Sequence, residues 1–401
     1  MKIAIVSDFH LGYEKFFEDA YNQAYEALKE ARQEADMIIV PGDIFDNRSP
    51  KPEVLAQGIN IFRSIGNWKW EAKITSYIGE RKIYTTIPII AIPGTHERRS
   101  EKSENAVELL SLAGLLANVS EACAIVEKNG EKVAVYGIGG ISEERFGETL
   151  KKLDPKPVEG AFNIFVFHQS VYELMPFSKD FIKFEELPKG FDLYIDGHIH
   201  NKVEGKVHGK PFLIPGSTVL TQLKESELEK KGFFVFDTEK LSYSFHEINS
   251  RGFHLIKVDV TGRTPNEIIE EADKKINNTL EQYKESVPII RVVLSGNAPE
   301  SFRQNDFDIR ALIKKYENKV LLDISKDIDD SGVKLEIDGL RSGSIENLSI
   351  KDYGLSIFLE KLASKGYNLR VKSSELFDIL SSEKNKEKVI DKAMEELFSK
   401  K

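Results

Sequence analysis

A repeated pattern in residues 1–240 constrains the fold of this chain more than any other feature: short apolar runs open directly into polar clusters. The runs that do so are 2–6, 37–40, 87–92, 163–167 and 193–195. Helical periodicity lies between several of them, for example at 21–35 and 52–65. Runs that are apolar on both faces and alternate with helices predict a sheet covered by helix layers. Such folds place ligands at the carboxyl ends of the strands.

The polar clusters hold most of the chemistry of the chain. Five of the eight histidines lie in them, namely His10, His96, His168, His198 and His200. The D-x-H spacing at 8–10 and the H-x-H spacing at 198–200 would let each pair present two ligands to one point, because residues i and i+2 of an extended segment share a side. Asp43 follows a glycine that allows a sharp turn, and its carboxylate can bridge two ions. Mixed carboxylate and imidazole ligands suit Mn, Fe or Zn better than Mg or Ca. The sequence therefore predicts a metal site, and a purely structural role for all these clusters is the less favoured alternative.

The remaining segments predict three parts of the chain. Strand-like runs without intervening helices, at 132–138, 211–215 and 232–237, indicate that part of the sheet is antiparallel or mixed. After residue 249 the pattern restarts with a strand, and Thr264-Pro265-Asn266-Glu267 is typical of a helix start. The tail carries apolar residues at helical spacing. The predicted domains are 1–248, a small α/β domain at 249–340 and a helical segment at 341–401.

Composition limits the classes of protein to which the chain can belong. The formal net charge of -9 argues against a protein that coats nucleic acid through its overall field. The single cysteine, Cys123, excludes an intramolecular disulfide framework and a cysteine-based zinc cage. No apolar run is long enough for a signal peptide or a membrane span. We therefore expect a cytoplasmic protein with no membrane contact.

Several stretches carry a family resemblance. The order D-x-H, G-D, G-T-H-E, a lone H and G-H-x-H resembles the calcineurin-like metallophosphoesterases. Within that superfamily, the sequence is similar to the SbcD-like, meiotic-recombination-eleven DNA repair nucleases of archaeal type. The stretches that carry this second resemblance are DFHLGYEKF, GDIFDNRSPKP, FVFHQS, GHIH and IPGSTVLTQLKESELEKKGFFVFD. The resemblance implies an α/β (α+β) fold: a β-sandwich flanked by helices, a small α/β capping domain at 249–340 and C-terminal helices.

The resemblance also implies roles for individual residues. His96 would act as general acid or stabilise charge on the scissile phosphate. The cofactors would be two Mn²⁺ ions. The first metal would be held by Asp8, His10, Asp43 and His200, and the second by Asp43 as a bridge, Thr95, His168 and His198.

Thr95 is the main departure from the family pattern, which has asparagine at this position. Its hydroxyl is a neutral oxygen one bond closer to the backbone, so it would reach the second metal directly or through a water. Tyr13, Arg98 and Arg99 are candidate DNA contacts, with core packing of Tyr13 and surface exposure of the two arginines as the alternatives. Glu97 is expected to orient a ligand or His96 rather than to bind metal.

The function implied by the resemblance is a manganese-dependent nuclease that hydrolyses phosphodiesters at DNA ends, as a 3′-5′ exonuclease and single-strand endonuclease. The implied partners are DNA ends, a second copy of the chain through 52–65, and an SMC-like coiled-coil ATPase of the SbcC type at 341–401. A helical tail packed on its own protein is the alternative for that last segment. Two other functions stay open: another metallophosphoesterase acting on a small diester or a phosphoprotein, and a catalytically weak DNA-end-binding scaffold, because of Thr95. For the long segment 67–86, with Trp68 and Trp70, tryptophan in the core is the default expectation, and contact with DNA or with a subunit is the alternative.

Overall fold

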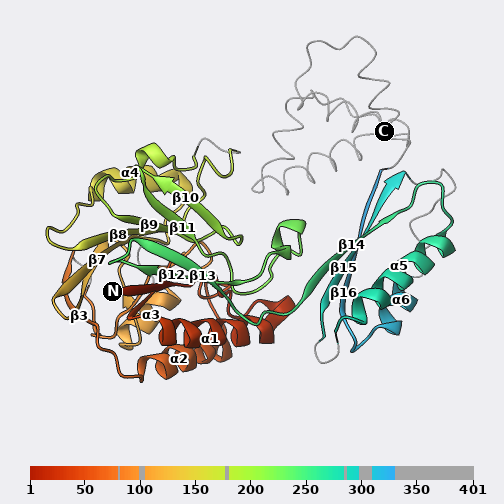
Figure 1. Cartoon of the computed structure of the whole chain (residues 1–401), viewed down its shortest axis with the longest axis horizontal. Helices are drawn as coiled ribbons and strands as arrows, with labels where there is room; N and C mark the ends of the chain where they lie inside the picture. Colours follow the sequence, from red (N-terminus) through yellow and green to blue (C-terminus); the bar gives the residue numbers. More distant parts are fainter. Residues whose placement is uncertain (80–81, 99–103, 177–179, 284–286, 298–308, 330–401) are drawn as a thin grey trace, which may run out of the picture. The chain divides into compact units, whose positions relative to one another are not determined.

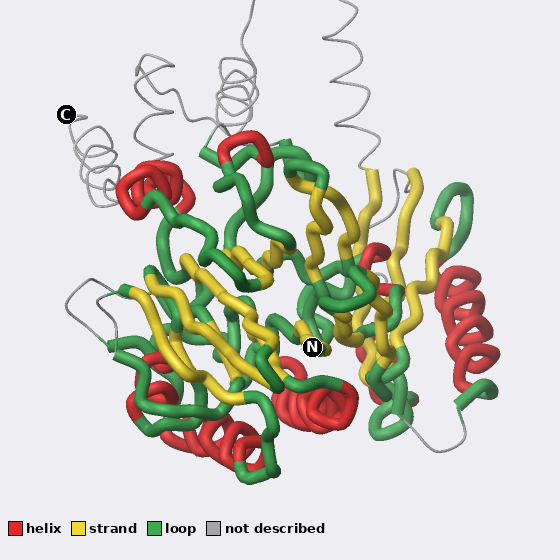
Figure 2. Tube along the Cα trace, turned by 60° about the vertical axis from the view of Figure 1, so that its left-hand side comes forward, coloured by secondary structure: helices red, strands yellow, loops and turns green. Residues whose placement is uncertain are grey.

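The computed structural model describes residues 1–79, 82–98, 104–176, 180–283, 287–297 and 309–329, and the rest of the chain is drawn in grey in Figures 1 and 2. The predicted helical segment 341–401 and Arg99 lie outside the described residues. Contacts between residues define two units. The first comprises Met1–Val258, Pro265–Leu294 and Phe307–Lys326. The second comprises Asp259–Thr264, Ser295–Asp306 and Asp327–Lys401, and most of it lies outside the described residues.

The first sheet contains the strands that precede three of the polar clusters. Its order is β13 (Ser242–Glu247), β12 (Gly232–Asp237), β1 (Lys2–Ile5), β2 (Met37–Val40), β4 (Ile89–Ala91) and β5 (Ala117–Asn118). Strands β1, β2, β4 and β5 pair in parallel, whereas β12 and β13 are antiparallel. The polar clusters after β1, β2 and β4 therefore meet at one edge.

The second sheet is also mixed. Its order is β10 (Val203–Val207), β11 (Lys210–Ile214), β9 (Leu193–Asp196), β8 (Phe162–Phe167), β7 (Glu131–Ile138), β6 (Ala122–Lys128) and β3 (Lys73–Ile78). Strands β7, β8, β9 and β11 run in parallel, and β10, β6 and β3 pair antiparallel with their neighbours. The prediction that part of the sheet structure is mixed is confirmed.

The two sheets pack face to face, and helices cover their outer faces (Figure 1). Ile5 and Ile39 of the first sheet share a buried cluster with Val135 and Ile164 of the second. Helices α1 (Phe17–Glu34), α2 (Pro52–Gly66) and α3 (Ala106–Leu112) pack on the first sheet, and α4 (Glu143–Leu153) packs on the second. The predicted sandwich is confirmed. Alternation alone predicted one sheet between helices, because a strand buried by a second sheet is as apolar as one buried by a helix.

The chain after residue 249 forms the predicted succession of strands and helices. They are β14 (Phe253–Asp259), α5 (Pro265–Leu280), β15 (Ile289–Asn297), α6 (Ile309–Lys315) and β16 (Leu321–Asp329), with sheet order β14-β15-β16. Ile268, Ala272 and Ile276 lie four residues apart on α5 and are buried. This spacing places them on one helix face, as expected for an amphipathic helix.

The segment 67–86 adds an edge strand to the second sheet. Strand β3 lies within it and pairs antiparallel with β6. Trp70 is buried, and the Arg32 guanidinium lies 3.9 Å from the centre of its ring, whereas Trp68 is 40% exposed. The default expectation of core tryptophan thus holds for Trp70 alone. Contacts of this segment, or of α2, with DNA or a second copy stay predictions.

Three short 3-10 helices complete the regular structure of the described residues: η1 (Glu14–Phe16), η2 (Phe184–Glu186) and η3 (Glu225–Leu228). No helix among the described ranges combines the length and apolar character that crossing a bilayer requires.

Candidate metal centre

The predicted ligands lie in loops just beyond the carboxyl ends of parallel strands. Asp8 and His10 follow β1, Asp43 follows β2, and His198 and His200 follow β9. The backbone at Asp8, His10, Asp43 and His198 is left-handed, with φ of 54°, 47°, 47° and 70°. This region is uncommon for residues other than glycine, and such strain concentrates at functional sites.

The left-handed backbone corrects one prediction. His198 and His200 were expected to present two ligands to one point, as on an extended strand. Instead His200 joins Asp8 and His10, whereas His198 joins Asp43 and His168. Residues 198–200 lie beyond the end of β9, and His198 has a φ of 70°, so the alternation of an extended strand does not apply to them; the separate assignment of His200 and His198 to two metals, which the resemblance implied, matches the two groups.

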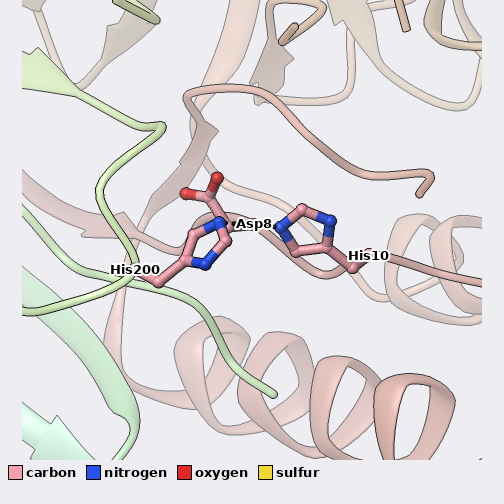
Figure 3. A group of neighbouring side chains, drawn as sticks. All are labelled: Asp8, His10 and His200. Carbon is pink, nitrogen blue, oxygen red and sulfur yellow. Dashed lines mark hydrogen bonds between the residues drawn. The ribbon is translucent and has the colours of Figure 1, made fainter. Parts of the chain in front are cut away.

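We call Asp8, His10 and His200 the first group. Their ligand atoms all lie within 4.8 Å of one another. The Nε2 atoms of His10 and His200 are 3.1 Å apart, and Figure 3 shows the two rings turned toward each other, with the Asp8 carboxylate beside them. The Nδ1 atom of His10 lies 3.1 Å from Asp46 Oδ1, so it donates its proton to that carboxylate.

The first group fits a divalent cation. His10 Nδ1 is already occupied by Asp46, so the space between the two Nε2 atoms suits a shared proton or a cation. Asp8 Oδ2 is buried and has no hydrogen-bond partner among the described residues, and burial raises the pKa of Asp8 although the nearby histidines oppose this. Burial lowers the pKa of His200 to about 2, with the charge of His10 contributing, so His200 is neutral and able to bind metal.

We call Asp43, His168 and His198 the second group, whose ligand atoms also lie within 4.8 Å of one another. His168 donates from Nδ1 to the Pro41 carbonyl at 2.7 Å, and its Nε2 faces Asp43 Oδ2 at 3.1 Å. Burial opposes both charges, but each stabilises the other: the pKa of His168 rises to about 10 and that of Asp43 falls below its usual range. Without a cation these two residues form a buried ion pair. Burial lowers the pKa of His198 to about 4, which leaves its imidazole neutral.

Thr95 and His96 lie against Asp43. The Thr95 hydroxyl donates to Asp43 Oδ2 at 3.3 Å, and the His96 backbone N–H donates to Asp43 Oδ1 at 2.9 Å. The His96 side chain is 42% exposed and donates from Nδ1 to the Asp46 carbonyl at 2.8 Å. Its Nε2 is therefore available to a substrate. Thr95, His96 and Arg98 line one cavity of about 790 Å³.

Glu97 ties two of the loops together. Its buried carboxylate accepts from the Phe45 N–H at 2.8 Å and from the Gly94 N–H at 2.7 Å. Burial, helped by the nearby Asp43 charge, raises its pKa to about 8. Glu97 therefore acts on the backbone of the loops that carry Asp43 and Thr95, and its contact is not with the His96 ring.

Tyr13 donates its hydroxyl to the Thr221 carbonyl at 2.6 Å, and its predicted DNA contact, like those of Arg98 and Arg99, stays a prediction. The sequence reasoning missed three supporting residues. Glu143 at the start of α4 places Oε1 4.0 Å from His198 Nε2, and Thr221 and Glu227 lie behind His200. Thr221 and Glu227 lie in the stretch 214–237 that carries the family resemblance, but nothing in its spacing identifies them as partners of His200, and Glu143 reaches the centre from a helix start.

Comparison with known proteins gives the family of the chain. The family model for calcineurin-like phosphoesterases matches residues 1–202. A DNA double-strand break repair protein Mre11 of Methanopyrus kandleri is 27% identical over 286 residues, covering 64% of this chain and 59% of that protein. An MRE11 of Encephalitozoon cuniculi is 27% identical over 259 residues, covering 59% and 45%. The Mre11 of Sulfolobus acidocaldarius is 23% identical over 321 residues, covering 75% and 76%.

This chain thus spans about half the length of the first two relatives, 59% and 45%. The predicted resemblance to the meiotic-recombination-eleven proteins is confirmed. The matched region contains β1, β2, β4, β8 and β9 and every residue of the two ligand groups. The chain therefore belongs to the calcineurin-like phosphoesterase family, whose members bind divalent metal ions.

Proposed function

We propose that this chain is a metal-dependent DNA nuclease that hydrolyses phosphodiester bonds at DNA ends during double-strand break repair. The observation that carries the proposal is the pair of ligand groups, one around Asp8 and one around Asp43, with His96 beside them. The relatives that match the chain over its first half and beyond are named as double-strand break repair proteins, which supports DNA as the substrate.

The chain's own residues have separate tasks in this reaction. Divalent ions in the two groups would act as Lewis acids on the phosphoryl oxygens and lower the pKa of the attacking water. Asp8, His10 and His200 would hold one ion, and Asp43, His168 and His198 the other. His96 keeps its Nδ1 proton on the Asp46 carbonyl, so Nε2 faces the substrate, and the imidazolium form of His96 would donate its Nε2 proton to the leaving oxygen of the phosphodiester.

The proposal includes finer points that follow from the resemblance. The ions would be two Mn²⁺, with Thr95 contributing to the second group. The reaction is 3′-5′ exonuclease and single-strand endonuclease cleavage, carried out in the cytoplasm by a homodimer together with an SMC-like coiled-coil ATPase. Tyr13, Arg98 and Arg99 contact the DNA backbone.

Two rival functions make different predictions. A phosphoesterase for small diesters or phosphoproteins shares the metal centre but would cleave a chromogenic diester better than DNA. A DNA-end-binding scaffold would bind ends yet cleave neither substrate. The resemblance of residues 214–237 to the repair nucleases favours the proposed function over both.

The test is hydrolysis of end-labelled duplex DNA and of a chromogenic diester in Mn²⁺, with wild type, His96→Ala and His246→Ala. His246 is the matched control, because it lies on β13, stacked on Phe233. We expect manganese-dependent shortening of DNA by wild type and His246→Ala, with a loss of about 10²- to 10⁴-fold in His96→Ala. Cleavage of the diester without cleavage of DNA would contradict the proposal, and cleavage of neither would favour the scaffold.

A further inference from the structure

A chain of hydrogen bonds runs from the back of His200 into the protein. His200 Nδ1 lies 2.5 Å from the Thr221 hydroxyl, and that hydroxyl lies 3.2 Å from Glu227 Oε1. Lys231 Nζ lies 3.5 Å from the same Glu227 oxygen and donates to the His200 carbonyl at 3.2 Å. Glu227 and Lys231 are 4% and 6% exposed, so this is a buried ion pair directly behind a predicted metal ligand.

The surroundings of Glu227 fix the direction of these hydrogen bonds. Its Oε1 accepts from the Thr221 N–H at 3.1 Å, and its Oε2 accepts from the Gln222 and Leu223 N–H groups, each at 2.7 Å. Burial opposes the charge, but Lys231 and these backbone donors lower the pKa of Glu227. An ionised carboxylate only accepts hydrogen bonds.

It follows that the Thr221 hydroxyl donates to Glu227, because Glu227 has no proton to give. The hydroxyl oxygen then accepts from His200, so the proton of the neutral imidazole sits on Nδ1. His200 Nε2 is left with its lone pair, which points at His10 Nε2 across 3.1 Å. The wrong tautomer would place a proton where the cation binds.

The loop that carries Thr221 is held in place from several sides. Tyr13 donates to the Thr221 carbonyl at 2.6 Å, and Lys231 Nζ donates to Ser217 Oγ at 3.0 Å. Ser217 N–H also donates to the His200 carbonyl at 3.1 Å. The hydroxyl of Thr221 is therefore fixed relative to both the ring and the backbone of His200.

We propose that Thr221, oriented by the buried Glu227–Lys231 pair, is a positioning residue that holds His200 in the Nδ1–H tautomer and so prepares the first group for its divalent cation. This inference rests on the proposed function only in that the first group binds a divalent cation. Hydrogen-bonded partners of this kind contribute about 10- to 100-fold to metal affinity in other proteins.

The variants that test it are Thr221→Val, which keeps the shape and removes the hydroxyl, and Thr221→Ser, which restores the hydroxyl. Thr218→Val is the matched control: Thr218 is a fully buried threonine three positions away, and its hydroxyl has no hydrogen-bond partner among the described residues. Long-range ¹H–¹⁵N spectra of ¹⁵N-histidine protein without metal report the His200 tautomer, and Mn²⁺ titration reports affinity.

We expect wild type, Thr221→Ser and Thr218→Val to show His200 with its proton on Nδ1. Thr221→Val is expected to populate the Nε2–H form and to bind Mn²⁺ about 10- to 100-fold more weakly. An Nε2–H tautomer in wild type would overturn the proposal even if Thr221→Val failed to fold. So would wild-type Mn²⁺ affinity in a folded Thr221→Val. If the tautomers and affinities are as expected but wild type does not cleave DNA, the proposed nuclease function is contradicted and this inference is supported.

Discussion

The two ligand groups of the metal centre are built differently. In the first group the Nδ1 atoms of His10 and His200 are occupied by Asp46 and Thr221, and Asp8 has a buried oxygen that no other described residue contacts by a hydrogen bond. In the second group Asp43 is already satisfied. Its Oδ2 lies 3.1 Å from the His168 ring and accepts from the Thr95 hydroxyl at 3.3 Å.

This difference predicts an order of affinity. The first group is arranged around a space that a cation can fill. The neutral ring of His200 is held in place, through Thr221, by the buried Glu227–Lys231 ion pair. The second group must give up the proton of His168 and the hydrogen bond of Thr95 before a cation can bind. We therefore expect the first group to bind a divalent cation more tightly than the second.

Replacing Asp8 should have the largest effect. Asp8→Asn removes the unpartnered carboxylate oxygen, so binding of Mn²⁺ at the tight site should fall by more than about 100-fold, beyond the cost of losing an outer partner. Electron paramagnetic resonance of free Mn²⁺ during titration measures this loss. If Asp8→Asn still binds one Mn²⁺ tightly, the first group is not the tighter site.

The control for this variant is Asp196→Asn. Asp196 is another fully buried carboxyl at the end of β9, and burial raises the pKa of Asp196 well above its usual range. Its Oδ1 accepts from the Gln169 N–H at 3.0 Å, which an asparagine oxygen also does. Asp196→Asn should leave Mn²⁺ binding unchanged.

Gly94→Ala should remove the second site and spare the first. A Cβ at residue 94 would lie 2.1 Å from Asp43 Oδ1 and 2.5 Å from the Asp43 backbone nitrogen, so the Asp43 loop must shift. We expect loss of the weaker Mn²⁺ site and of hydrolysis, a cost in stability of about 1–3 kcal/mol, and retention of the tight site.

Gly147→Ala is the matched control, because nothing lies within 4 Å of the added Cβ. Gly147 lies inside α4, where alanine should stabilise the protein by about 0.5–1 kcal/mol. Denaturant titration measures both changes. Loss of the tight Mn²⁺ site in Gly94→Ala would show that the two groups are not independent.

Thr95→Asn should raise the Mn²⁺ affinity of the second group, which is the weaker site. The amide oxygen reaches one bond further than the hydroxyl, so Mn²⁺ affinity at the second group should rise about 10-fold. Thr95→Val, which removes the hydroxyl, should not give this gain. If Thr95→Asn binds Mn²⁺ no more tightly than wild type, threonine already serves the second site. The weaker affinity of that site would then depend on His168 alone.

The smallest expected effect is the pH dependence of the metal-free protein. The pKa of His168 is raised from 6.5 to about 10, so its contribution to stability is full below pH 6.5 and is lost as pH rises toward about 10. Asp43 has a lowered pKa, so its contribution is present above 3.8 and lost below it. The stability advantage of wild type over His168→Gln in chelator should therefore shrink between pH 6.5 and 10. Thermal unfolding across this range measures it, and an advantage that grows with pH would show that the ion pair is absent.

Much of this architecture could be predicted from the sequence. Apolar runs followed by polar clusters identified β1, β2, β4, β8 and β9, and the helix start at Thr264-Pro265 was clear because capping chemistry is local. The division into two sheets could not be predicted from alternation, because both kinds of cover demand the same apolar residues. It came from the family resemblance.

The supporting residues of the centre were less predictable for a different reason. The direction of His198 depends on a left-handed backbone at that position, which spacing does not reveal. Thr221 and Glu227 reach His200 from a loop more than twenty residues away in sequence. Both lie in the stretch 214–237 that carries the family resemblance, but their contact with His200 is fixed by tertiary packing and does not follow from the spacing of that stretch.

The most direct test of the difference between the two groups is a calorimetric titration of the metal-free protein with Mn²⁺, repeated with Asp8→Asn and Gly94→Ala. We expect two classes of site in wild type, with the tighter class lost in Asp8→Asn and the weaker class lost in Gly94→Ala. Two sites of equal affinity in wild type, or loss of only the weaker site in Asp8→Asn, would contradict the proposed order of affinity.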